Sequence, residues 1–93
     1  MENSTTIPRK LDNADVLFFA KADGASFVQC GDERWPVVAV AIAHYPGTST
    51  YYLFSLDSAY EVIGDSDCAS IAEAMELAES SHRVQKHVWK AAS

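Results

Sequence analysis

The stretch "PVVAVAIAHY", residues 36–45, decides the fold, because it is apolar on both faces if it is extended. Side chains alternate along a β-strand, so Val38, Val40 and Ile42 would share one face. A strand that is apolar on both sides has to be covered on both sides. The rest of the chain must therefore provide two covers for this strand. The opposite face would hold Val37, Ala39, Ala41 and Ala43.

Further β-type runs stand on either side of this stretch, and turn sequences such as "ADG" at 22–24 separate them. Consecutive strands joined by short turns favour an antiparallel meander of about five strands. The first two runs are close enough to pair as a hairpin, with "GDERWP" (31–36) as the turn that follows. The flanking runs are "ADVLFFAKA" (14–22), "SFVQC" (26–30), "TYYLFSLD" (50–57) and "YEVIG" (60–64).

The period of the pattern changes after Gly64. Ser70 and Glu73 form a capping box, and good helix formers follow, which predicts a helix over 70–80. Glu73, Glu76 and Glu79 lie on its solvent face, so the helix is amphipathic and packs on one face of the sheet. The face toward the sheet would hold Ile71, Ala74, Met75 and Ala78.

The tail "HRVQKHVWKAAS", residues 82–93, fits two structures. Val84, Val88 and Trp89 could continue the helix by two turns, while alternation about Lys86 and Lys90 suits an edge strand. Serines at 80–81 favour a break followed by an extended segment. The predicted fold class is α+β: an antiparallel β-meander of about five strands, one amphipathic helix on one face, and an extra C-terminal edge strand.

The length of 93 residues predicts one domain, with a polar N-terminal leader at 1–12 and a single α+β domain at 13–93. The N-terminus lacks the layout of a signal peptide, and no apolar run is long enough to cross a membrane. Two cysteines, Cys30 and Cys68, are too few for a disulfide framework or a zinc site. We expect a cytoplasmic protein.

One helix of about three turns covers only part of one sheet face. For the other face the sequence leaves three covers open. The sheet could curl into a half-barrel, the C-terminal tail could fold back, or another molecule could dock. In the last case the molecule is either a second copy of the chain or a different protein, because exposed apolar patches commonly mark interaction sites.

The net charge is −6, and between Trp35 and His82 there is no lysine or arginine. Nucleic-acid binding is disfavoured, since it needs clustered basic residues. A basic protein partner is favoured, because an acidic surface attracts it over long range. Tyr51 and Trp35 are aromatic candidates for the same contact, since tyrosine and tryptophan dominate interface energetics. The acidic candidates are Asp57, Glu61, Asp65, Asp67, Glu73, Glu76 and Glu79.

No motif points to catalysis, a cofactor or a metal. The acidic residues around Asp65 and Asp67 do not match an EF-hand loop, and Asp or Ser before a helix ordinarily caps it. His82 and His87 are five residues apart, which does not place two ligands on one helical face. A couple of His44 with either cysteine has no motif around it.

The stretch "YYLFSLDSAYEVIGDSDCASIAEAMELAE", residues 51–79, resembles many short bacterial proteins in which a β-hairpin leads into an acidic helix. Toxin-neutralising immunity proteins and phage-encoded inhibitors are small acidic α+β proteins of this kind. This resemblance of size and charge implies a non-enzymatic intracellular protein-binding module, an acidic antagonist that covers a basic surface on a partner enzyme. The alternative is a homodimeric accessory protein that uses the open sheet face, with a small enzyme or ligand carrier as a third interpretation.

Overall fold

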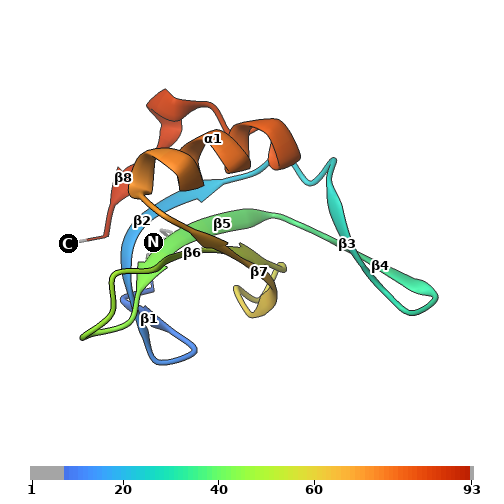
Figure 1. Cartoon of the computed structure of the whole chain (residues 1–93). Coiled ribbons are helices and arrows are strands. Elements are labelled where there is room, and N and C mark those ends of the chain that lie inside the picture. Colours follow the sequence, from blue (N-terminus) through green and yellow to red (C-terminus); the bar gives the residue numbers. More distant parts are fainter. Residues whose placement is uncertain (1–7, 93) are drawn as a thin grey trace, which may run out of the picture.

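A curled antiparallel sheet with one helix on one face forms the body of the protein (Figure 1). The computed structural model describes residues 8–92, apart from the side chain of Cys30. The predicted α+β fold is confirmed, including the C-terminal edge strand, β8 (Lys90–Ala91), which pairs with β2. The strands run in the spatial order β1 (Lys10–Leu11), β2 (Ala14–Lys21), β5 (Ala39–His44), β6 (Tyr51–Leu56), β7 (Val62–Cys68).

The central strand is β5, and it is buried on both faces as predicted. Val40 and Ile42 lie on the helix side, while Ala41 and its alanine neighbours face the other way. The simple alternation fails before Ala39, because Val37 joins the helix-side core and Val38 is only half-buried. The regular strand therefore begins at Ala39, three residues later than the sequence pattern indicates.

Helix α1 (Ile71–His82) covers the helix-side core. The Ser70 side chain accepts a hydrogen bond from the Glu73 backbone N–H at 3.1 Å, as the capping box predicts. Ala74 and Ala78 are fully buried, which lets the helix approach the strands closely. Ile71 and Met75 are only half-buried at the margins of this contact.

The helix continues through the two serines to His82, so the expected break comes two residues later. Arg83 ends it in the left-handed conformation (φ 60°), with its backbone N–H bonded to Ala78 and Glu79. A short 3₁₀ turn, η1 (Lys86–Val88), then leads to β8. The tail is thus folded back along β2, and Val84 fills part of the helix-side core.

The chain itself covers the second face of the sheet. Phe19 and Phe54 lie there with the alanines of β5, and the Tyr60 ring meets Phe19 edge-on at 5.2 Å. Leu11 and Ala92, from the two ends of the described chain, also pack against this cluster. Register shifts in the β2–β5 and β6–β7 pairs favour the curl, because bulges increase twist. The sequence left three possible covers for this face. In the structure the curvature of the sheet covers it, together with Ala92 of the C-terminal tail.

The predicted pairing of 14–22 with 26–30 is wrong. β2 pairs with β5, and β3 (Phe27–Cys30) pairs instead with β4 (Glu33–Pro36) in a separate two-stranded ribbon. Residues 33–36 are therefore strand, and the turn shrinks to Gly31 and Asp32, where Gly31 takes a positive φ of 61°. Burial favours this outcome, because β2 extends the apolar surface of β5 on both faces. Its Phe18 packs against the helix-side core and its Phe19 lies in the cluster on the other face.

The last strand of the sheet is longer than predicted. β7 runs from Val62 to Cys68, so Asp65 and Asp67 belong to a strand and not to the loop before α1. At the other end, Asp12 and Asn13 both have positive φ and join β1 to β2 in a tight turn. Most of the leader expected at 1–12 lies outside the described residues, and Lys10–Leu11 of it form β1.

Replacing Ala78 by Leu tests the close approach of α1 to the sheet. The extra carbons meet a fully buried site, so we expect the free energy of unfolding to fall by about 1–3 kcal/mol. The control is Ala72→Leu on the exposed side of the same helix, which should change it by less than about 0.5 kcal/mol. Chemical denaturation measures both, and equal losses would contradict this packing.

Candidate partner-binding surface

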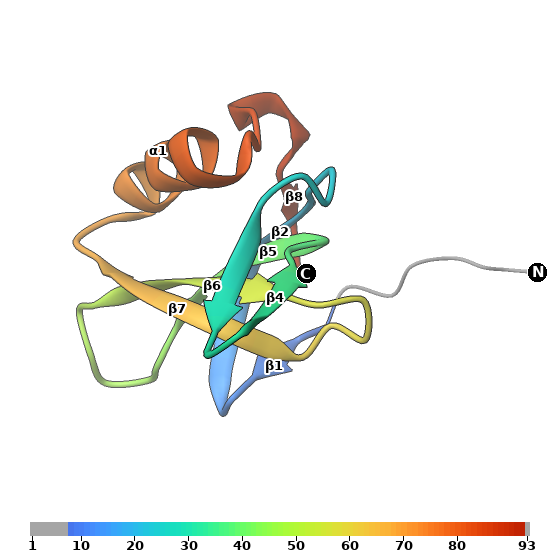
Figure 2. The same ribbon diagram turned by 90° about the vertical axis from the view of Figure 1, so that its right-hand side faces the viewer.

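The β3–β4 hairpin projects from the body of the protein (Figure 1), and Figure 2 turns this side toward the viewer. All four residues of β4 are exposed. Among the described residues, the large hydrophobic side chains that remain exposed are Phe27 (47%), Trp35 (38%) and Val88 (38%). Two of these three lie on the hairpin, so the exposed apolar surface gathers on its most prominent feature.

One backbone hydrogen bond closes the base of the hairpin, and two side-chain contacts anchor it to the rest of the fold. Val28 packs over Gly64, where an added Cβ would come within 3.3 Å of a Val28 methyl carbon. The backbone N–H of Val37 donates to the Ser26 carbonyl at 2.9 Å. The Ser26 hydroxyl bonds to His82 Nδ1 at 2.8 Å. An isolated two-stranded ribbon is marginal in water, so these contacts hold it in place.

The two faces of the hairpin differ in chemistry. On one face, Trp35 Nε1 donates a hydrogen bond to Glu33 Oε1 at 2.9 Å. On the other, the Arg34 guanidinium lies 4.7 Å from the centre of the Phe27 ring, a cation–π arrangement. Each exposed aromatic ring therefore contacts one charged side chain of the hairpin: Trp35 contacts Glu33, and Phe27 contacts Arg34.

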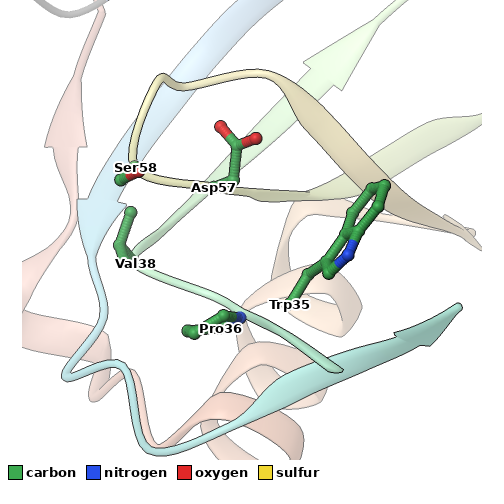
Figure 3. Close-up of a pocket in the computed structure, with 5 residues that line it drawn as sticks. All are labelled: Trp35, Pro36, Val38, Asp57 and Ser58. Atoms are coloured by element: carbon green, nitrogen blue, oxygen red, sulfur yellow. The ribbon is translucent and has the colours of Figure 1, made fainter. Parts of the chain in front are cut away.

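A cavity of about 290 Å³ opens between β4 and the turn after β6 (Figure 3). Trp35, Pro36 and Val38 form its apolar wall, and Asp57 and Ser58 belong to the turn side. The volume lies near the small end of ligand pockets and suits a single side chain. The fold therefore brings two predicted partner-binding residues, Trp35 and Asp57, to one site.

Asp57 owes its position to its own turn. Its Oδ1 accepts hydrogen bonds from the backbone N–H groups of Ala59 and Glu61, both at 2.9 Å. The Asp57 backbone N–H donates to the Glu61 carbonyl, which closes the turn. The carboxylate is thereby held rigidly, and Glu61 stands exposed beside it in the same turn.

The other acidic candidates lie on two sides of the sheet. Asp65 and Asp67 pair with Phe54 and Tyr52, whose side chains face away from α1, and paired residues share a face. The helix glutamates are on α1, where Glu73 accepts a hydrogen bond from the Ala69 N–H at 2.7 Å. The structure does not bring these carboxylates together with Asp57. The exposed acids of α1 are Glu73, Glu76 and Glu79, of which Glu76 stands 3.9 Å from the Lys86 ammonium.

Tyr51 has a mainly structural environment. It is half-buried against the helix-side core, and its ring lies 5.1 Å from that of His44. In the register of the sheet it stands between His44 of β5 and Cys68 of β7. A direct couple of His44 with Cys68 is therefore not formed. The Cys68 thiol is buried, and burial, followed by the nearby Glu73 and Asp67 charges, raises its pKa.

His82 joins three elements that sequence periodicity did not connect. Nδ1 bonds to the Ser26 hydroxyl at 2.8 Å, and Nε2 bonds to the Ser55 hydroxyl at 3.3 Å. Burial lowers the pKa of the imidazole below its usual value. A serine hydroxyl either donates or accepts, so both bonds fit a neutral ring. The three residues tie the end of α1, strand β6 and the base of the hairpin into one polar clamp.

The described side chains contain no group of three or more His, Cys, Asp and Glu residues that could hold a metal ion. No helix within residues 8–92 is long and apolar enough to cross a membrane. Compared with protein-family models, curated proteins and solved structures, the chain shows no significant match to any of them.

Acidification tests the clamp around His82. The folded-state pKa lies below the unfolded one, so this group's contribution to stability is complete above the unfolded value and is lost as pH falls through the folded one. We expect the free energy of unfolding to fall from pH 7.5 to 5.5, and the fall to be smaller in His82→Gln. His87→Gln, at an exposed position, is the control and should retain the wild-type slope. Denaturation at a series of pH values measures all three, and an unchanged slope in His82→Gln would contradict the clamp.

Proposed function

We propose that the protein is a non-enzymatic protein-binding module, an acidic antagonist that uses its β3–β4 hairpin to cover a basic surface on a partner enzyme inside the cell. One observation carries the proposal. A projecting hairpin exposes Phe27 and Trp35 in a protein whose net charge is −6. The assignment of an enzyme as the partner rests on the resemblance in size and charge to immunity proteins and inhibitors.

The hairpin has the chemistry of an interface centre. Aromatic residues and arginine are the commonest energetic hot spots in protein–protein contacts, and this ribbon exposes Trp35 on one face and Phe27 with Arg34 on the other. Burying exposed apolar surface contributes roughly 25 cal/mol per Å². The anchored base limits the conformational entropy that docking would cost, because the hairpin is already held in place.

The acidic residues support a different part of the same function. They are spread over β7, the 57–61 turn and the outer side of α1, so they generate a general negative field instead of one contact patch. Such a field mainly accelerates association with a basic partner and weakens as salt increases. Different residues therefore serve the two steps of binding. The widely spread acidic residues attract the partner, and the exposed apolar residues of the hairpin contact it.

Self-association is the alternative, and among the described strands the main sheet offers it β7, an edge strand much longer than β1 or β8 at the opposite edge. The second sheet face is already covered, which leaves β7, the last strand in the sheet order. Two antiparallel copies of β7 centred on Ser66 would set Asp65 of each copy against Asp67 of the other. Like charges directly opposite one another destabilise strand pairing. This repulsion favours a different, basic protein as the partner.

Truncation of the hairpin aromatics tests the docking surface. The full chain is first used to capture its partner. The partner is then purified, and its binding to each variant is measured directly. Phe27→Ser and Trp35→Ser should each weaken the complex by about tenfold or more, as hot-spot truncations do. Val88→Ser is the matched control, since Val88 is as exposed as Trp35 but lies outside the hairpin. Titration calorimetry measures the affinities, and equal losses in all three variants would contradict the hairpin as the interface.

Charge reversal tests the attraction. We expect Asp65→Lys, Asp67→Lys and Glu79→Lys together to slow association with the same partner about tenfold at low salt. Glu73 and Glu76 are spared, because one caps the helix and the other stands near Lys86. The difference should shrink as salt increases. An unchanged association rate at low salt would show that these carboxylates serve solubility alone.

A further inference from the structure

We propose that the cavity beside Trp35 is a receptor for one arginine or lysine side chain of the partner. The inference rests on the proposed function and deepens it, because it names the group that the docking surface would recognise. The cavity lies between the hairpin and the 57–61 turn, so a partner that contacts the hairpin also reaches its opening (Figure 3).

The walls suit the stem of a basic side chain. Trp35, Pro36 and Val38 present an indole, a pyrrolidine ring and two methyl groups. Lysine and arginine have long aliphatic stems that bury readily along such surface while their charged ends stay near water. The indole face adds a specific attraction, since tryptophan is the best of the aromatic residues at binding cations.

The charges around the cavity have the complementary sign. Asp57 belongs to its lining, and Glu33 is bonded to the indole N–H of Trp35. No lysine or arginine is among the lining residues, and Arg34 points to the other face of the hairpin, over Phe27. That contact shows the same chemistry within the chain, with a guanidinium on an aromatic ring at 4.7 Å. The Asp57 carboxylate is held by two backbone N–H groups of its own turn and points into that turn (Figure 3), so its charge acts on the neighbouring cavity from a fixed position.

Asp57→Asn separates the charge from the structure of the turn. An asparagine Oδ1 accepts the same two backbone hydrogen bonds, so the turn is retained while the negative charge is removed. Asp23→Asn is the matched control. Asp23 also accepts a backbone hydrogen bond within its own turn, from Ala25 at 2.9 Å, but it does not line the cavity.

The experiment titrates the isotope-labelled full chain with small probes and follows its two indole N–H signals by NMR, with Trp35→Phe assigning that of Trp35. The probes are N-acetyl-arginine amide, N-acetyl-lysine amide and the uncharged N-acetyl-norleucine amide. We expect saturable shifts at Trp35, with the two cations binding about two- to fivefold more tightly than norleucine amide. In Asp57→Asn this preference should decrease, because one of the negative charges near the cavity is removed, and in Asp23→Asn it should be unchanged.

Other outcomes overturn the inference. Equal binding of norleucine amide would make this a cavity for an apolar side chain. Absence of any saturable shift would mean that the cavity recognises no side chain by itself. Shifts at Trp35 that depend on protein concentration without a probe would identify a second copy as the occupant. If Trp35→Ser weakens the captured complex while Asp57→Asn leaves its affinity unchanged, the proposed function survives and the basic side-chain receptor does not.

Discussion

The burial of β5 on both faces is the constraint on which the rest of the structure depends. The two faces of β5 differ in the size of their side chains. On the helix side, Ile42 lies between Phe18 and Leu53 of the neighbouring strands. On the other side, Ala41 lies between the large rings of Phe19 and Phe54, and the small residue leaves the room that those rings occupy. The sheet can therefore curl over the alanine side while α1 covers the other.

This constraint also produces the candidate binding surface. Because β2 and β6 must flank β5, the chain between β2 and β5 is excluded from the central sheet. Within that segment, β3 and β4 pair with each other and leave the body as a hairpin (Figure 2), while Val37 returns to the core. The contacts of the hairpin at Gly64 and His82 hold it without burying Phe27 or Trp35. The prominence of the hairpin is thus a consequence of how the core is filled.

The polar clamp at His82 couples the elements that surround the proposed interface. The ring connects the end of α1 to the sheet at Ser55 and to the base of the hairpin at Ser26. Removing the clamp would loosen the hairpin at its root while Val28 still packs over Gly64. Three side chains thus connect the helix end, the sheet and the hairpin by direct hydrogen bonds.

The sequence by itself determined the elements whose signals are local: the doubly apolar strand, the capped helix with its buried Ala74 and Ala78, and the α+β class. It also indicated Trp35 and Asp57 as contact residues, from residue type and charge. Only the tertiary structure decided that β2 pairs with β5, that the two residues line one cavity, and that Phe27 is exposed on the opposite face of the hairpin. Pairing depends on which strand best extends the apolar surface on both faces of β5, and this is a property of the whole core. Short-range patterns contain no information about that competition between distant segments.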